Sequence, residues 1–301
     1  MGPRFHRGRY RLKTMSTLTN VHNLPEPIVS AIRNDDYDPG DSDYTCTQII
    51  KPVRIVHLTK RHDKEIVEDA ADKIWLLMGN LMHQMFERAQ VDNALVEERV
   101  FLDVLDHKIS GAADLYLKDV LTDYKVTSAW TAVYKTRHEE WSAQLNILNH
   151  LFTSAGFPAK RLQIVAIYRD WSKSKALAGN GYPKAAVEVI PFPIWEKYVV
   201  QTFIHQRIKA LIANEDCADD DLPECTPEDM WEKPTVWAVM REGRKSALRL
   251  LDTETAAVYW MTTERKGDEI VKRPGARTRC EDYCSVAPFC SQFKTYSQKE
   301  I

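Results

Sequence analysis

The chain has 301 residues, of which 44% are hydrophobic and 28% are charged, so it can bury a core of useful size as one large domain or one domain with an appendage. Its formal net charge of −2 gives no global basic field, which argues against a protein that passively coats DNA but not against an enzyme with separate acidic and basic regions. No apolar run is long enough for a membrane-spanning helix, so no contact with a membrane is expected.

Residues 1–43 predict a flexible N-terminal segment. The chain begins with a basic stretch through Lys13 that lacks the apolar core of a secretory signal, and it continues with many Asn, Asp, Pro and Ser residues. The basic stretch could attract phosphate groups, or it could be no more than a leader before Met15.

Residues 44–214 predict a mixed α/β core. Apolar residues at helical spacing predict helices at 62–90, 137–154 and 193–213, with Gly79 as a break in the first. Strands are predicted at 95–105, 108–117, 119–127, 161–169 and 185–190. Short polar breaks separate the first three strands, as in a meander of antiparallel hairpins. The order of these elements predicts a mixed sheet flanked by helices.

An acidic connector follows Asn214 and marks a change in composition. We place a domain boundary there, which leaves 215–301 as a C-terminal lobe. Three of the six cysteines of the chain lie close together in this lobe.

Two strands bring carboxylates and a lysine together. Because side chains two apart in a strand share a face, Asp123 and Lys125 point the same way, and Asp114 on the neighbouring strand can lie beside them. Two adjacent carboxylates repel each other unless a cation lies between them, and Mg²⁺ and Mn²⁺ prefer such oxygen ligands. The pattern predicts a metal site with a lysine beside it. An exposed hairpin with scattered charges is the alternative, because Asp-x-Lys is a common tripeptide.

Other polar residues flank this trio along the chain. His83 follows Gly79 on a helical pattern, Glu98 opens the strand hairpin, and Gln144 lies on the next helix. A single helical histidine is more often structural than a ligand.

The order Gly-x-x-x-His, Glu, Gly-x-x-Asp, Asp-x-Lys and Gln resembles the RecB-type branch of the PD-(D/E)XK nucleases, over about residues 44–295. Within that branch the chain looks most like phage-encoded exonuclease-like proteins and the CRISPR-associated adaptation nucleases. The resemblance implies that His83, Asp114 and Asp123 ligate Mg²⁺ or Mn²⁺, with the backbone carbonyl of Tyr124 completing the shell.

The resemblance also implies roles for three further side chains. Lys125 would act on the attacking water, Gln144 would contact DNA or position Lys125, and Glu98 would be a substrate-positioning or metal-supporting acid. Two positions depart from the common pattern of this branch: Asp123 stands in place of Glu, and Leu148 stands where a tyrosine is frequent.

The C-terminal cysteines predict a second metal site. Cys280, Cys284 and Cys290 form a C-x3-C-x5-C pattern, and three thiolates so close in sequence suit a soft metal that needs a fourth ligand. Without a secretory signal, a disulfide framework is not the default. For the fourth ligand we favour Cys225, in a Pro-bounded turn, over Cys46.

Several enzymes of the RecB-type branch hold a [4Fe–4S] cluster with three clustered C-terminal cysteines and one distant cysteine, and the resemblance implies the same here, although the common spacing there is C-x2-C-x5-C. Zn²⁺ and no metal at all are the alternatives. Cys217 is expected to be a free thiol in a loop.

Basic runs at 241–249 and 265–279, interleaved with aromatic residues, could contact phosphates and unpaired bases, or could be a solvated face over a small core. The segment 52–62 is a further basic candidate near the predicted metal site.

The resemblance as a whole implies a Mg²⁺- or Mn²⁺-dependent deoxyribonuclease that works in recombination or DNA processing. An exonuclease acting on single strands or duplex ends fits better than an endonuclease. The resemblance also points to a bacterial cytoplasm and a phage-encoded source, with a homo-oligomer or a recombination partner protein left open. The alternatives are a catalytically silent DNA-binding protein that keeps the fold and cluster, and a cysteine-metal interaction module that binds no DNA.

Overall fold

The computed structural model describes residues 16–34, 40–89 and 91–299, and the chain divides into two compact units. Unit 1 consists of Met1–Lys51 and Asp63–Asp216, and unit 2 consists of Pro52–His62 and Cys217–Ile301. The second boundary lies two residues from the expected one, but the assignment of Pro52–His62 to the C-terminal unit was not foreseen. The predicted basic stretch through Lys13 lies outside the described residues.

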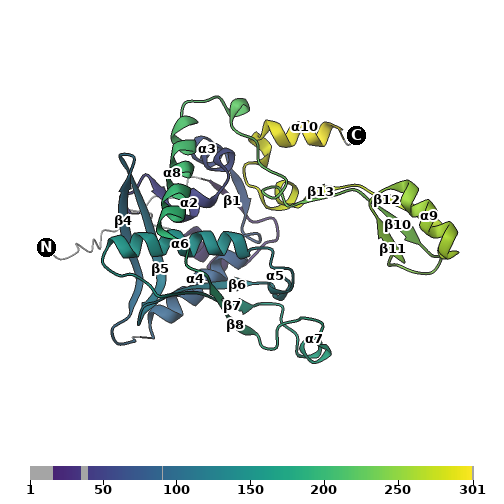
Figure 1. The fold of residues 1–301 in the computed structure, drawn as a ribbon. Helices are drawn as coiled ribbons and strands as arrows, with labels where there is room; N and C mark the ends of the chain where they lie inside the picture. The colour runs from purple at the N-terminus through teal and green to yellow at the C-terminus, as the bar shows by residue number, and fades with distance from the viewer. Residues whose placement is uncertain (1–15, 35–39, 90, 300–301) are drawn as a thin grey trace. The chain divides into compact units, whose positions relative to one another are not determined.

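Unit 1 is built on a six-stranded mixed sheet, which agrees with the expected α/β class (Figure 1). Its strand order is β2-β5-β6-β7-β8, and β4 pairs with β5. The strands are β2 (Tyr44–Thr45), β4 (Leu95–Val104), β5 (His107–Leu117), β6 (Val120–Thr127), β7 (Arg161–Tyr168) and β8 (Val187–Phe192).

The register of this sheet positions the predicted site. Antiparallel pairing joins β4 to β5 and β5 to β6, as the predicted meander requires. Parallel pairing then joins β6 to β7, so that Asp123 lies opposite Ile164 and Lys125 lies opposite Ala166. The strand β7 is buried at alternate positions and holds β6 in the middle of the sheet.

Two helices matter most for the site. The helix α6 (His138–Ser154) packs along the sheet, and its residues Trp141, Leu145 and Leu148 are almost wholly buried. The helix α4 (Ile74–Glu87) packs against β6. The remaining helices of unit 1 are α1 (Glu26–Arg33), α2 (Cys46–Ile50), α5 (Ala129–Tyr134), α7 (Lys173–Ala178) and α8 (Lys197–Ala213).

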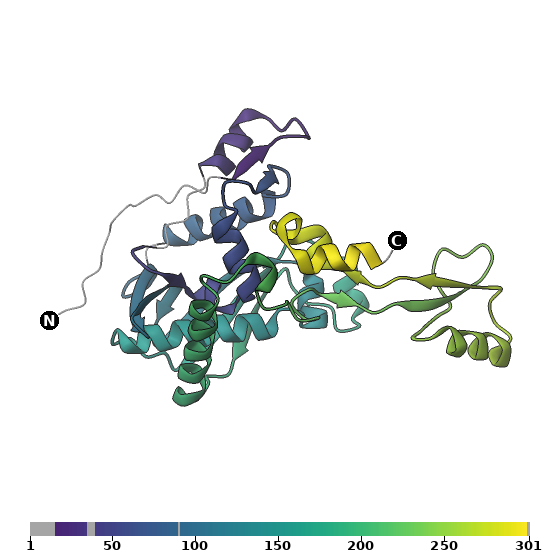
Figure 2. The same cartoon turned by 90° about the horizontal axis from the view of Figure 1, so that it is seen from above.

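Two sequence expectations about unit 1 were wrong. The helical stretch expected at 62–90, as one bent helix or two broken at Gly79, is instead a strand, β3 (Val67–Asp69), followed by α4, which continues through Gly79. The carboxylate of Asp69 accepts hydrogen bonds from the backbone N–H groups of Val21 and Ala71 and stops a helix there. The segment expected to be irregular contains α1 and a strand, β1 (Thr17–Thr19), which pairs in parallel with β3. Figure 2 shows this N-terminal piece in purple at one border of unit 1.

Unit 2 combines a cysteine-containing part with a small helix-covered sheet. The cysteine-containing part holds α3 (Val53–Arg61), the 3-10 turn η1 (Asp219–Asp221), the π-helical turn η2 (Arg279–Tyr283), the 3-10 turn η3 (Ala287–Phe289) and α10 (Ser291–Lys299). A two-stranded ribbon of β9 (Glu232–Lys233) and β13 (Ala276–Arg277) leads from it to the small sheet, as both views show (Figures 1 and 2).

The small sheet has the order β11-β10-β12 and is antiparallel throughout. Its strands are β10 (Val236–Met240), β11 (Arg249–Leu251) and β12 (Glu269–Arg273), and the helix α9 (Glu254–Glu264) packs on all three. Ala238, Val239 and Ala257 are fully buried between helix and sheet, so this piece has its own small core. Among the described residues, no helix of either unit is long and apolar enough to cross a membrane.

Candidate metal centre and cysteine pocket

One group of potential ligands for a single metal ion stands out among the described residues: His83, Glu97 and Asp114, whose ligand atoms all lie within 4.8 Å of one another. His83 is on α4, Glu97 is on β4 and Asp114 is on β5. The Nδ1 atom of His83 lies 3.0 Å from Oε1 of Glu97 and 3.4 Å from Oδ1 of Asp114. Asp114 is 7% exposed, so its charge is largely removed from water and requires partners such as these.

Asp123 and Lys125 extend this group along β6. Asp123 is 2% exposed, and its Oδ1 atom accepts a hydrogen bond of 2.8 Å from Nε2 of Gln144 on α6. Its Oδ2 atom lies 2.7 Å from Nζ of Lys125 as an ion pair, without the angular geometry of a hydrogen bond. The backbone N–H of Tyr124 donates a hydrogen bond of 2.5 Å to Asp114, which ties β6 to β5 at this point.

The carboxylates of Asp114 and Glu97 stabilise the protonated form of His83. Hydrogen bonds to Asp114 and then to Glu97 raise the pKa of His83 to about 10, against the opposing effect of burial. Burial raises the pKa of Asp123 to about 6, the charge of nearby Asp114 adds to this rise, and Lys125 opposes it. Mutually perturbed acid and base groups in one place are typical of a functional site.

The structure brings together six of the seven residues expected at the metal site and leaves one out. Asp114 contacts His83 and the backbone N–H of Tyr124, whose carbonyl was the expected ligand. On the adjacent strand Asp123 contacts Lys125 and Gln144, and the charge of Asp114 is near enough to raise the pKa of Asp123. Glu98 was expected to take part, but the carboxylate that reaches His83 belongs to its neighbour Glu97. In the register of β4 with β5, Glu98 pairs with Ala113 and Glu97 lies opposite Asp114, so the side chain of Glu97 is the one beside the cluster.

The backbone at Glu97 explains why this neighbour was missed. Its φ angle is 52°, in the left-handed region that side chains with a Cβ seldom adopt, and it interrupts the ladder between β4 and β5 opposite Asp114. Such an outlier at a cluster of ligands is the kind of strain that functional sites retain. The sequence signal was the pair Glu97–Glu98, but nothing in the sequence chose between its members.

Leu148 has a structural role. A side chain at Gly111 would clash with Leu148 and with the thiol of Cys46, so all three residues pack tightly where β5 meets α2 and α6. Both side chains are buried, and burial raises the pKa of Cys46 to about 12. Cys46 therefore belongs to the core of unit 1, which corrects its place as second choice for a ligand of the C-terminal site.

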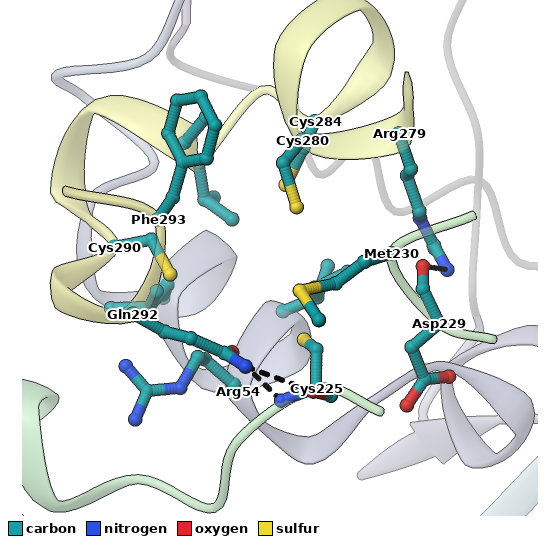
Figure 3. Close-up of a pocket in the computed structure, with 14 residues that line it drawn as sticks. Arg54, Cys225, Asp229, Met230, Arg279, Cys280, Cys284, Cys290, Gln292 and Phe293 are labelled. Carbon is teal, nitrogen blue, oxygen red and sulfur yellow. Dashed lines mark hydrogen bonds between the residues drawn. The ribbon is translucent and has the colours of Figure 1, made fainter. Parts of the chain in front are cut away.

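Four cysteines line one pocket in unit 2 (Figure 3). They are Cys225, Cys280, Cys284 and Cys290, and Figure 3 shows their thiols turned toward one shared space. None of them forms a disulfide. Burial, and then a neighbouring charge, raises the pKa of Cys225 to about 12 and that of Cys280 to about 11, so both thiols hold their protons unless a metal displaces them.

Hydrogen bonds hold the two sides of this pocket together. The side-chain amide of Gln292 accepts a bond of 2.8 Å from the N–H of Cys225 and donates one of 2.9 Å to its carbonyl. Apolar side chains, including those of Met230, Val286 and Phe293, make up much of the remaining lining, and the charged residues Arg54, Asp229 and Arg279 also contribute to it. Cys217 lies apart, on the acidic connector, where its thiol contacts the carbonyl of Ala218.

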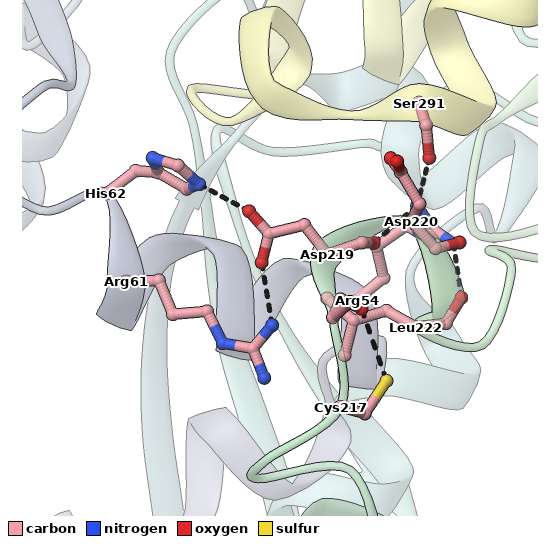
Figure 4. A network of polar contacts seen from close by, with 9 residues as sticks. Arg54, Arg61, His62, Cys217, Asp219, Asp220, Leu222 and Ser291 are labelled. Carbon is pink, nitrogen blue, oxygen red and sulfur yellow. Dashed lines mark hydrogen bonds and ion pairs between the residues drawn. The ribbon is translucent and has the colours of Figure 1, made fainter.

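Arg54 anchors α3 to the connector beside this pocket (Figure 4). Its guanidinium is 2% exposed and donates to the carbonyls of Asp219, Asp220, Leu222 and Pro223 and to the hydroxyl of Ser291. Nearby, Asp219 pairs with Arg61 at 2.6 Å and with His62 at 2.7 Å, and the His62 ring stacks on Phe289.

These contacts remove Arg54 and His57 from the basic candidate segment 52–62, of which Lys60 remains exposed. Arg54 and His57 are buried, and the guanidinium of Arg54 donates its hydrogen bonds to carbonyl groups inside unit 2. Arg277 and Arg279, in the run 265–279, are also structural: Arg277 lies over the ring of Tyr296, and Arg279 donates to the carbonyl of Asp229. The other basic residues of 241–249 and 265–279 are exposed.

Comparisons with known proteins identify no family. No protein-family model matches the chain, and no curated protein matches it. Among solved structures, one described as "Crystal structure of SSO0001" is similar, with 16% sequence identity and a TM-score of 0.42 over 63% of this chain and 85% of that one.

Proposed function

We propose that this chain is a Mg²⁺- or Mn²⁺-dependent deoxyribonuclease of the PD-(D/E)XK type. One observation carries the proposal: His83, Glu97 and the buried Asp114 form a group of potential metal ligands, and the buried Asp123 stands next to it, paired with a lysine. All five residues come from one sheet and one helix, which fix their positions. A site of this kind suits a hard divalent cation and a substrate with negative charge.

The acidic side chains are suited to hold the cation. Asp114 and Asp123 are both buried, and together with Glu97 they concentrate negative charge that a single lysine and a single histidine only partly offset. A bound Mg²⁺ or Mn²⁺ would supply charge neutralisation at the phosphate and a water of lowered pKa. The proton that His83 now shares with two carboxylates would leave as its imidazole became a ligand.

Lys125 is the residue best placed to act on the reacting groups. Its side chain is 26% exposed, whereas the Asp123 carboxylate beside it is almost fully buried, so the ammonium is the part of the pair that a substrate can reach. A lysine ammonium can orient a water or stabilise charge that develops on a phosphate. Gln144 contacts Asp123 and is a positioning residue, because it fixes the orientation of that carboxylate.

We assign the cysteine pocket to a [4Fe–4S] cluster with a structural role. The four thiolates around a single Zn²⁺ ion lie about 3.8 Å apart, as bond lengths of about 2.3 Å require. Among the described residues, the four cysteines do not form a group whose ligand atoms all lie within 4.8 Å of one another. A four-iron cluster suits such wider spacing, because the metal–sulfide core stands between the thiolates.

The test is cleavage of end-labelled single- and double-stranded DNA by anaerobically purified protein with Mn²⁺, Mg²⁺ or EDTA. Lys125→Ala is the diagnostic variant, and Lys160→Ala, an exposed lysine paired with Asp119, is its matched control. Metal-dependent cleavage that only Lys125→Ala abolishes would support the proposal, and the product ladder would separate exonuclease from endonuclease. DNA binding without cleavage in any metal would instead favour a catalytically silent DNA-binding protein.

A further inference from the structure

Exposed aromatic rings gather at the end of β6 in unit 1. Trp130 and Tyr134 lie on α5, which begins directly after β6, and their rings stack at 5.8 Å with an angle of 18°. Trp130 is 41% exposed and Tyr134 is 68% exposed, whereas Trp141 and Phe152 of the same unit are almost fully buried. These two rings therefore contribute little to a core, and Tyr134 is the more open ring of the stacked pair.

Positive charges accompany these rings. The ammonium of Lys175, on α7, lies 5.2 Å from the centre of the Trp130 ring. The guanidinium of Arg169, directly after β7, lies 4.4 Å over the ring of Trp75, which is 50% exposed. Exposed flat rings with cations beside them are the combination that holds unpaired bases and their phosphates.

Hydrogen bonds fix the rings of α5 in place. The carboxylate of Asp170 accepts from the hydroxyl of Ser128 at 2.6 Å and from the N–H of Ala129 at 2.7 Å, at the start of α5. Tyr182 is buried, bonds through its hydroxyl to the carbonyl of Asp170, and meets the edge of Trp130 at 5.6 Å. The rings are therefore ordered before any ligand arrives, which lowers the entropy lost on binding.

The same elements carry the candidate metal centre. Trp130 follows Lys125 by five positions, and the N–H of Arg169 bonds to the carbonyl of Thr127 at the end of β6. Trp75 precedes His83 by eight residues on α4, which corresponds to about 12 Å along a helix. Figure 1 shows α5 and α7 at the same end of the sheet, where β6, β7 and β8 meet the loops.

We propose that Trp75, Trp130 and Tyr134, with Arg169 and Lys175, form a stacking platform for single-stranded DNA that leads away from the metal centre. The faces of paired bases are covered by their neighbours in a duplex, so exposed rings of this kind select unpaired bases. The inference rests on the proposed function for the choice of DNA as ligand, and it adds a preference for single strands.

The experiment measures binding, so that it does not depend on cleavage. Fluorescence anisotropy would follow a labelled oligothymidylate of about twelve nucleotides, within the range that single-strand sites span, on holoprotein carrying Lys125→Ala. Adding Trp130→Ala and Tyr134→Ala together should weaken binding at least about tenfold, because each stacked base contributes measurably. Binding of a blunt duplex of the same length should change by less than about twofold on the same reasoning.

Three matched variants make the result specific. Tyr198→Ala removes an equally exposed ring on α8 and should leave binding unchanged. Trp130→Phe keeps a ring and should retain most of the affinity, which excludes misfolding as the cause of any loss. Lys175→Ala should reduce the salt dependence of binding by about one counterion.

Several outcomes would overturn the platform. Unchanged binding of the oligothymidylate after both ring substitutions would do so, as would an equal loss for the single strand and the duplex. Failure of the parent protein to bind either DNA would also do so and would point to a protein ligand for these rings. Absence of cleavage together with a ring-dependent loss of single-strand binding would reject the nuclease function and leave the platform standing.

Discussion

The two candidate metal sites of this chain are built in opposite ways. The acidic cluster of unit 1 takes Asp114, Asp123 and Lys125 from adjacent strands of one sheet, so backbone register sets their spacing. The cysteine pocket of unit 2 takes its thiols from a turn, a π-helical turn and short loops, with few backbone ladders between them. The first site is positioned by sheet register, whereas the second, under the proposed function, relies on a bound cluster in addition to the contact of Gln292 with Cys225.

The largest effect should therefore come from breaking the cysteine pocket. Cys284→Ser should remove the metal and unfold the cysteine-containing part of unit 2, because ligation at structural metal sites contributes roughly 10 kcal/mol or more. Metal content and thermal unfolding would be measured together, with Cys217→Ser as the control outside the pocket. A Cys284→Ser protein that unfolds at the parent temperature would show that the thiols carry no structural metal.

The next largest effect should come from Arg54. Arg54→Met leaves several buried carbonyls without their donor, which should lower the free energy of unfolding of unit 2 by about 3 kcal/mol. Arg61→Met, which breaks a partly exposed ion pair with Asp219, should lower it by about 1 kcal/mol or less. Denaturant titration of both variants would rank them, and equal losses would contradict a special role for the buried arginine.

In unit 1, a substitution in the acidic cluster should change the affinity for metal and leave the stability of the protein almost unchanged. Glu97→Gln should weaken Mn²⁺ binding by about 10- to 100-fold, the range found for groups that support metal ligands. Glu98→Gln, one residue along β4, should bind Mn²⁺ like the parent. Calorimetric titration of the two variants would settle which glutamate serves the site, and the reverse ranking would restore Glu98 to the role first expected of it.

The smallest effect on stability should come from replacing Asp170, whose carboxylate bonds to the start of α5. Hydrogen bonds from Ser128 and Ala129 lower the pKa of Asp170, in spite of an opposing effect of burial. A lowered carboxyl pKa stabilises the folded state above the unfolded value of about 3.9, and this stability is lost as pH falls through the folded pKa.

Asp170→Asn should therefore lower the unfolding free energy of unit 1 by less than about 1 kcal/mol at neutral pH, since the carboxylate is exposed. The gap between variant and parent should begin to narrow below about pH 4 and should vanish once pH is below the lowered folded pKa, where the parent carboxyl is also neutral. Denaturation curves at several pH values would measure this gap, and a gap that widens in acid would contradict the assignment.

Local rules predicted much of the unit 1 site. Strand alternation is sufficient to place Asp123 and Lys125 on one face, and a two-strand hairpin is sufficient to bring Asp114 beside them. The position of Glu97 was not predictable, because it depends on a left-handed backbone at a residue that sequence rules treat as ordinary strand.

Long-range contacts set the other limit on what the sequence could predict. The membership of α3 in unit 2 rests on contacts with residues more than 150 positions away, such as the bonds of Arg54 to carbonyls and the pairing of Arg61 with Asp219, and no spacing rule detects such partners. The aromatic rings of α5 were missed for a related reason: exposure distinguishes Trp130 from the buried Trp141, and both lie in stretches of similar composition.

The bond between Arg54 and Ser291 also orders events during synthesis of the protein. These residues are 237 positions apart, so at about 5–20 residues per second a ribosome needs roughly 10–50 s to make the second after the first. For most of that interval, until the residues from Cys217 onward are made, the apolar side of α3, including Val53, Val56 and Leu58, has no partner from the C-terminal part of its own unit. Unit 2 can close around its cysteines only after Cys290 has been made, so the pocket forms after every strand of the unit 1 sheet has been synthesised.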